Sequence, residues 1–168
     1  ENVEEAIKAF PGFGVDVVVK PIFGSRGMGI TKISDAEIAG RMFRLLHYNH
    51  LVLYLQQYIK HGGKDVRCFV VGDRVVAAMY RISTDWKTNV SRGGKPIPFK
   101  PEEEMEKTAV KAAKTIGCEV AGVDLMVGDW GMMVHEINSQ PGFMGLQTSS
   151  GIDIAGEIAE YIIQKTNT

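Results

Sequence analysis

The order of hydrophobic and polar positions predicts short strands and a few amphipathic helices along the whole chain. Alternating or β-branched runs between glycine, proline and aspartate are typical of strands, and apolar residues three or four positions apart are typical of helices. Strands are predicted at residues 15–20, 30–33, 51–59, 65–71, 74–82, 123–128 and 132–139. Helices are predicted at residues 1–10, 34–48, 101–116 and 152–165, and residues 85–95 and 142–151 are expected to be loops.

The helix at residues 34–48 has the most complete set of signals. Ser34 and Glu37 form a capping box, in which each side chain accepts from the backbone N–H of the other residue. The apolar residues inside this helix fall on one face, which is expected to be buried. These residues are Ile38, Met42, Leu45 and Leu46.

A predicted hairpin in the C-terminal half carries two carboxylates within apolar strands. A three-residue loop that ends at Gly131 would pair Gly128 with Met132 and place Asp124 directly opposite Glu136. Cβ atoms of directly opposed residues are about 5 Å apart, so two carboxylates there repel each other unless a cation lies between them. The sequence therefore predicts a positively charged partner for this pair.

Asn138 lies two positions after Glu136 and therefore on the same face of its strand. Two carboxylates and an amide oxygen are hard ligands that suit Mg²⁺, which completes its shell with water and phosphate oxygens. Asp124, Glu136 and Asn138 are therefore the candidate metal ligands. Neutralising either carboxylate is expected to leave the metal-free fold at least as stable. The alternative is an acidic hairpin tip that is simply solvated.

A glycine-rich loop follows the first predicted strand. Glycines let backbone N–H groups approach an anion closely, and polar side chains add donors, so a phosphate group is the natural ligand. Lys20, at the end of the strand, could place its ammonium group on a phosphate oxygen. The alternative is a plain hairpin loop beside a lysine that extends into solvent. The candidate residues of the loop are Gly24, Ser25, Arg26, Gly27 and Gly29.

Two further groups of charged residues leave their role open. Asp65 and Arg67 lie on one face of a strand, which suits a structural ion pair and a pair of groups aimed into one pocket equally well. The loop at residues 85–95 contains Lys87, Arg92 and Lys95, which could close over an anion or could be solvated.

Composition excludes several classes of protein. The 168 residues suffice for one core or for two small lobes that share a cleft. A formal charge of −1 with 45% hydrophobic residues gives no sign of a nucleic-acid or membrane surface. No apolar run approaches the roughly 20 residues of a transmembrane helix. Together with first residues that do not resemble a signal peptide, this favours a cytoplasmic protein. Cys68 and Cys118 are isolated in apolar surroundings, which argues against a disulfide framework or a zinc site.

The motifs together resemble those of the ATP-grasp superfamily and, within it, the RimK-type carboxylate–amine ligases. The resemblance covers nearly the whole chain and depends on the order and spacing of the motifs. They are Val18-Val19-Lys20-Pro21 with the glycine-rich loop, Gln57-Tyr58-Ile59 with Asp65-Val66-Arg67, residues 88–94, Ala121-Gly122-Val123-Asp124, and Glu136-Ile137-Asn138 with residues 139–142.

This resemblance implies an α+β ATP-grasp fold, in which two α+β lobes with antiparallel sheets enclose the nucleotide cleft. Residues 1–168 would form that domain, with a small lobe at about 15–60 and a large lobe at 61–168. The N-terminal domain of the family and one further nucleotide-contacting lysine have no counterpart here. The chain is therefore expected to be a fragment that is inactive by itself.

The resemblance also implies a role for each candidate residue. Lys20 and the glycine-rich loop would hold the phosphates of ATP, the backbone of Gln57 and Tyr58 would contact adenine, and Asp65 would face the nucleotide. Arg92 would hold the reacting carboxylate and, with Lys20, stabilise developing negative charge. The nucleotide-binding set is Lys20, Gly24, Ser25, Arg26, Gly27, Gly29, Gln57, Tyr58, Asp65, Arg67, Lys87 and Asn89. The ligands for Mg²⁺ (or Mn²⁺) would be Asp124, Glu136 and Asn138.

The implied activity is ATP-dependent ligation through an acyl phosphate. The expected substrates are ATP, glutamate or a similar amino acid, and an acceptor carboxylate on a protein C-terminus or a small-molecule coenzyme. The alternative is a nucleotide-binding module without turnover, in a regulatory or structural role. No membrane or nucleic-acid partner is expected, and a homo-oligomer stays open for the full-length protein.

Overall fold

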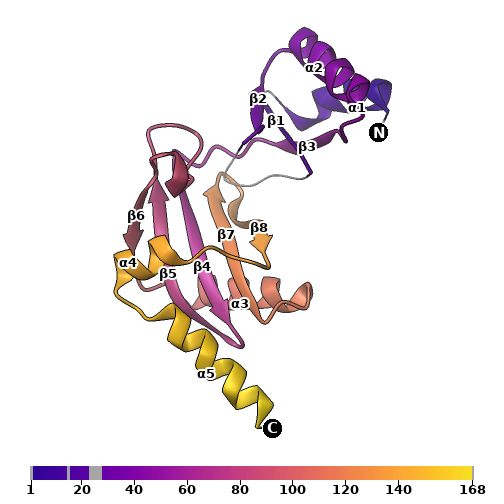
Figure 1. Cartoon of the computed structure of the whole chain (residues 1–168). Helices are drawn as coiled ribbons and strands as arrows, with labels where there is room; N and C mark the ends of the chain where they lie inside the picture. The colour runs from indigo at the N-terminus through magenta and orange to yellow at the C-terminus, as the bar shows by residue number, and fades with distance from the viewer. Residues whose placement is uncertain (1, 15, 23–27, 168) are drawn as a thin grey trace. The chain divides into compact units, whose positions relative to one another are not determined.

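The computed structural model describes residues 2–14, 16–22 and 28–167. The chain divides into two compact units, Glu1–Ile59 and Lys60–Thr168, and each has its own sheet and hydrophobic core (Figure 1). Gly24, Ser25, Arg26 and Gly27 of the predicted phosphate loop lie outside the described residues.

The first unit is a three-stranded antiparallel sheet with two helices on one face. Its strands lie in the order β2-β1-β3. Val17 and Val19 of the central strand point to the helices and pack with Phe43, whereas Val18 and Lys20 alternate onto the opposite face. The elements are α1 (Val3–Ala9), the 3₁₀ helix η1 (Phe10–Phe13), β1 (Val17–Lys20), β2 (Thr31–Ile33), α2 (Ala36–Tyr48) and β3 (Tyr54–Gln57).

The predicted start of α2 is displaced by one residue. Asp35, not Ser34, is the N-cap, and its Oδ1 accepts from the backbone N–H of Ile38 at 2.9 Å. The Ser34 hydroxyl donates instead to the Asp16 carboxylate. A tertiary hydrogen bond therefore replaces the predicted local cap.

The predicted buried face of α2 is also partly wrong. Ile38 and Leu45 are more than half exposed, and the other two predicted residues are only partly buried. Phe43 is fully buried instead, and Gly40 permits the side chain of Ile7 on α1 to approach. The close contact between the helices, which a small residue allows, determines the buried face.

The second unit contains a five-stranded antiparallel sheet in the order β6-β5-β4-β7-β8. The hairpin predicted around Gly72 is present as β4 and β5. The short strand β6 was not predicted; it contains Pro96 and Pro98, which are tolerated because it lies at the edge of the sheet. The strands are β4 (Lys64–Val71), β5 (Arg74–Ile82), β6 (Lys95–Pro98), β7 (Val120–Gly128) and β8 (Gly131–Asn138).

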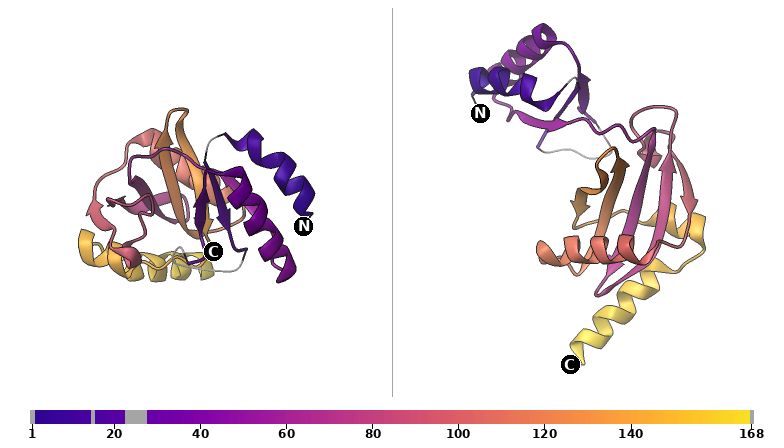
Figure 2. Two further views of the ribbon diagram at one scale, coloured as in Figure 1. Left: turned by 90° about the horizontal axis from the view of Figure 1, so that it is seen from above. Right: turned by 180° about the vertical axis from the view of Figure 1, so that it is seen from behind.

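Helices cover both faces of this sheet (Figure 2). On one face α3 (Glu103–Thr115) packs small residues, Ala109 and Ala113, against the strands. On the other face lie α4 (Met144–Ser150) and α5 (Ile154–Thr166). The prediction of a loop at 142–151 was wrong, because Leu146 buries itself on the sheet and makes this segment helical. Among the described residues, no helix is long and apolar enough to cross a membrane.

Candidate functional site

The face of the second sheet that carries α4 and α5 also holds a row of charged residues. Strand pairing sets Asp65 opposite Arg81, Arg67 opposite Asp124, and Asp124 opposite Glu136. Residues directly opposite each other on paired strands share a face, and residues two apart on one strand share it as well. The five side chains therefore form one group on a single face, here called the charge row.

The hairpin reaches the predicted register by a different route. Gly128 pairs with Gly131, which has a φ of 88°, so the turn contains two residues and not three. The register then shifts between Asp124 and Leu125, because His135 is an additional residue on β8. Asp124 consequently faces Glu136, as predicted, with the extra residue in a bulge and not in the turn.

Two arginines supply the positive partners that the buried carboxylate of Asp124 requires. Arg67 donates from Nε to Oδ1 at 2.5 Å and from Nη2 to Oδ2 at 2.8 Å, and Arg81 donates from Nη2 to Oδ2 at 2.8 Å. Burial opposes ionisation, yet Arg81 and Arg67 outweigh it and hold the pKa of Asp124 below its usual value. The carboxylate is therefore ionised and held in a fixed orientation.

Asp65 forms the second buried ion pair of the row. Arg81 donates to its two oxygens at 2.7 and 2.6 Å, and the Thr88 hydroxyl donates to Oδ2 at 2.6 Å. Asp65 and Arg67, whose role the sequence left open, each form an ion pair with a residue of a neighbouring strand. Burial alone would lower the pKa of Arg81, but Asp124 and Asp65 raise it above its usual value. The sequence interpretation assigned no role to Arg81 or Thr88.

The loop after β5 presents Lys87, Asn89 and Arg92. Thr88 is anchored to Asp65, and the 3₁₀ helix η2 (Val90–Arg92) follows. A Cβ atom on Gly94 would lie 2.1 Å from the Thr88 carbonyl oxygen, so the loop packs closely on itself. Burial and then the charge of Arg92 lower the pKa of Lys87, which Asp85 partly opposes. Lys87 and Arg92 therefore lie close enough to repel each other, and an anion bound beside them would relieve this repulsion.

The end of the charge row at β8 has unused ligand capacity. The Glu136 carboxylate is exposed and makes no ion pair with another described residue. Asn138 pairs with Gly122, and its Nδ2 is buried without a hydrogen-bond partner in the described part of the chain. An amide rotated by 180° would place its oxygen at that position.

These residues fit a divalent cation with few protein ligands. A carboxylate has about four acceptor sites, and the arginines use three of those on Asp124, which leaves one on Oδ1. Glu136 and Asn138 add further oxygens. The described residues contain no group of three or more His, Cys, Asp or Glu around one point. Water and phosphate oxygens would have to complete the shell, as they usually do for Mg²⁺.

In the first unit, Lys20 lies opposite Tyr54 on the sheet face that the helices leave open. β3 is an edge strand, and the Tyr58 N–H donates to the Asp16 carbonyl at 3.1 Å, so the backbone groups of Gln57 point away from β1. Gly29 has a φ of 74°. Lys20 and Gln57 thus belong to one sheet, with backbone donors and acceptors exposed at its edge, and Gly29 lies in the turn before its strand β2.

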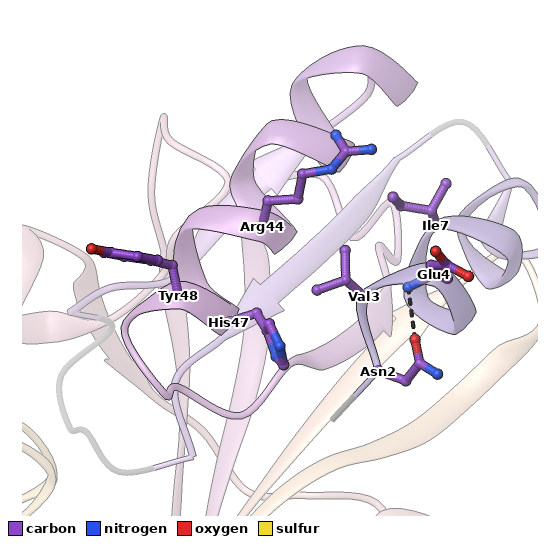
Figure 3. Close-up of a pocket in the computed structure, with 7 residues that line it drawn as sticks. All are labelled: Asn2, Val3, Glu4, Ile7, Arg44, His47 and Tyr48. Atoms are coloured by element: carbon purple, nitrogen blue, oxygen red, sulfur yellow. Dashed lines mark hydrogen bonds between the residues drawn. The ribbon is translucent and has the colours of Figure 1, made fainter.

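A separate hollow of about 680 Å³ lies between α1 and α2 (Figure 3). Its lining includes Ile7, Arg44, His47 and Tyr48 and none of the residues predicted for the site. His47 and Tyr48 belong to the last turn of α2. The hollow is therefore not part of the candidate site.

Comparison with known proteins identifies the family. Residues 1–162 match the RimK-like ATP-grasp domain family. The chain belongs to this family. The RimK-like family match confirms the resemblance of the motifs, and the two antiparallel sheets with their helices confirm the α+β ATP-grasp fold.

Curated RimK-like relatives are alpha-L-glutamate ligases by name. A probable alpha-L-glutamate ligase of a Picosynechococcus species is 43% identical over an alignment of 155 residues that covers 89% of this chain and 50% of that protein. The tetrahydromethanopterin:alpha-L-glutamate ligase of Methanocaldococcus jannaschii is 40% identical over 173 residues, covering 98% and 58%. The chain thus spans about half the length of the curated relatives it matches.

Solved structures show the same ATP-grasp fold. The ATP-grasp ligase PsnB, complexed with a phosphomimetic variant of its minimal precursor, Mg and ADP, matches with a TM-score of 0.74 at 24% identity, over 98% of this chain and 51% of PsnB. A RimK domain protein from Sphaerobacter thermophilus matches with a TM-score of 0.72 at 19% identity, over 95% and 58%.

Proposed function

We propose that the chain is the nucleotide-binding and catalytic part of an ATP-dependent carboxylate–amine ligase that forms ADP. The observation that carries this proposal is the opposition of Asp124 and Glu136 beside Asn138, whose buried Nδ2 has no hydrogen-bond partner among the described residues. Two carboxylates and an amide in this arrangement suit a divalent cation, and the arginine pairs keep Asp124 ionised without using all its acceptor sites.

In the second unit, Asp124, Glu136 and Asn138 would hold Mg²⁺ or Mn²⁺. The metal would neutralise charge on the phosphate oxygens of ATP. Lys87 and Asn89 would contact the phosphates, and Arg92 would hold the reacting carboxylate. The proximity of the two cations Lys87 and Arg92 supports an anion between them.

In the first unit, Lys20 and the loop residues Gly24, Ser25, Arg26, Gly27 and Gly29 would contact the phosphates. The outward backbone groups of Gln57, at the edge of the sheet, support its assignment to adenine. The Tyr58 N–H bonds the Asp16 carbonyl, so the backbone of Tyr58 faces β1 and its assignment to adenine rests on the motif alone. Asp65 and Arg67 are engaged with Arg81 and Asp124, and we assign them to holding the site in place.

The reaction would proceed in two displacements. The acceptor carboxylate attacks the γ-phosphorus of ATP, which forms an acyl phosphate and releases ADP. The amine of the amino acid then attacks the acyl carbon, loses a proton and releases inorganic phosphate, leaving an amide. No protein nucleophile is required, so the residues act by positioning and by stabilising negative charge.

The names of the relatives support glutamate as the amino acid. The acceptor would be a carboxylate on a protein C-terminus or on a small-molecule coenzyme. We further propose that residues 15–60 and 61–168 act as the small and large lobes of one ATP-grasp domain. A cytoplasmic location, and the inactivity of the chain by itself, stay predictions.

A trapping experiment tests the proposed reaction. The natural full-length polypeptide is incubated with ATP, Mg²⁺, hydroxylamine and a series of carboxylate acceptors, and hydroxamate and ADP are measured. Hydroxamate that requires ATP and is lost in Glu136→Gln supports the ligase, and Arg74→Met on the distant end of β5 is the control. ATP binding without hydroxamate for any acceptor would refute turnover and favour a nucleotide-binding module.

A further inference from the structure

Arg81 contacts two carboxylates of different strands and is almost completely buried, with 5% of its surface exposed. Its Nε and Nη2 reach both oxygens of Asp65 on β4, and the same Nη2 reaches Asp124 on β7. We propose that Arg81 is a positioning residue that holds the anion-binding loop and the metal-binding carboxylate in one arrangement. This inference rests on the proposed function.

Arg81 is connected to the anion-binding loop through Asp65 and Thr88. The Thr88 hydroxyl donates to Asp65 Oδ2 at 2.6 Å, and that oxygen also accepts from Arg81. Thr88 is 5% exposed, and the backbone of Gly94 packs against its carbonyl group. Lys87 and Asn89 are the sequence neighbours of Thr88, so their positions depend on whether Asp65 is held.

Arg81 is connected to the proposed metal site through Asp124. Arg81 and Arg67 both donate to Oδ2, and among the described residues Oδ1 accepts only from Arg67 Nε, so the remaining acceptor site is on Oδ1. Because the two guanidinium groups prevent rotation of the carboxylate, the free lone pair of Oδ1 points in one fixed direction. Groups that orient a ligating carboxylate typically change metal affinity 10–100-fold when they are replaced.

Lysine cannot reproduce the contacts of Arg81. Its ammonium group is a compact point charge without the planar fork that reaches two carboxylates. Arg81→Lys therefore keeps the charge and loses the connection between Asp65 and Asp124. Thr88→Val has nearly the same shape and removes only the hydroxyl, so it releases the loop and leaves Asp124 with both arginines.

Two measurements that need no catalytic turnover separate these effects. Mn²⁺ affinity, measured by electron paramagnetic resonance, reports the metal site. Quenching of Trp86 by acrylamide reports the loop, because Lys87 Nζ lies 4.9 Å from the centre of its ring. The second tryptophan, Trp130, is replaced by phenylalanine in every variant.

The expected result is a pattern across four variants. Arg81→Lys weakens Mn²⁺ binding by about tenfold and increases Trp86 quenching. Thr88→Val increases Trp86 quenching and leaves Mn²⁺ affinity unchanged. Glu136→Gln weakens Mn²⁺ binding and leaves Trp86 quenching unchanged. Arg74→Lys, a matched change on the exposed end of β5, alters neither.

The proposal is overturned if Arg81→Lys leaves Mn²⁺ affinity or Trp86 quenching at the parent value. Thermal melts of each variant set the temperature at which all are folded, so that a change in either signal is not caused by unfolding. If the parent protein binds no Mn²⁺, with or without ATP, the metal site in the proposed function is wrong, and this inference fails with it. Normal metal binding in Glu136→Gln would likewise show that the metal site is wrong.

Discussion

Replacement of Asp124 by asparagine should destabilise the metal-free protein, whereas Glu136→Gln should not. The register alone suggested that both changes relieve the same repulsion. The contacts separate them, because Asp124 is buried between Arg67 and Arg81 and Glu136 is exposed at the edge strand. In Asp124→Asn the two guanidinium groups stay buried with one carboxylate fewer, and the new amide N–H₂ faces a donor.

The magnitude follows from the loss of one partner in a buried ion pair. Such a change costs about 3 kcal/mol. One kcal/mol shifts the melting temperature of a chain of this size by about 3 °C, so the expected decrease is about 9 °C. Glu136→Gln removes a charge that faces Asp124 and has no described ion-pair partner, so its melting temperature should stay equal or rise.

The assay is thermal unfolding in EDTA, followed by tryptophan fluorescence. Trp86 and Trp130 both belong to the second unit, so the signal reports the unit that contains the charge row. Asp73→Asn is the matched control, because it removes an exposed aspartate paired only with Lys114 in the described structure. If Asp124→Asn melts together with the parent, the two arginine contacts do not stabilise the protein and the reasoning is refuted.

Three further predictions use the same contacts. Because the pKa of Asp124 is lowered, its ion pairs stabilise the fold fully above the ordinary aspartate pKa of about 4, and the difference in melting temperature between the parent and Asp124→Asn should shrink as the pH falls below that value and be lost as it passes through the lowered pKa. Burial raises the pKa of Cys68 to about 12, with Asp124 and Glu106 adding to it, so a thiol reagent at pH 8 should label Cys118 in the native protein and both cysteines only after denaturation. A Cβ atom on Gly122 would lie 2.8 Å from a proline side chain and 3.4 Å from the Arg67 side chain, so Gly122→Ala should lower both the melting temperature and Mn²⁺ affinity, whereas Gly142→Ala, with open space around it, should change neither.

The sequence predicted most of the elements that carry a strong periodic signal. The hairpin of β4 and β5, the helix α3 and the helix α5 are confirmed, with ends that differ by at most two residues. It failed where tertiary packing overrides local preference. The segment that forms α4 has little helical signal in its sequence. Its helix is stabilised by the burial of Leu146 against the sheet.

The candidate site was only partly predictable, because bulges change the register of long strands. A regular ladder from the turn at Gly72 would have placed Asp65 opposite Tyr80. The irregularity between Phe69 and Val70 instead places Arg81 opposite Asp65, and no residue type in the sequence predicts this bulge. On the other hairpin, the assumed longer turn and the actual bulge at His135 happen to give the same register for Asp124 and Glu136.

The charge row indicates why metal and nucleotide should depend on each other. Arg67 and Arg81 balance Asp65 and Asp124, so the exposed Glu136 leaves the row with one uncompensated negative charge. A divalent cation at that end would change the local charge from −1 to +1, and a single carboxylate in water holds such an ion weakly. The phosphates of ATP would restore the balance and supply oxygen ligands. Mn²⁺ should therefore bind weakly to the parent alone and much more tightly when a nucleotide is present, and equal affinities would contradict this assignment of charges.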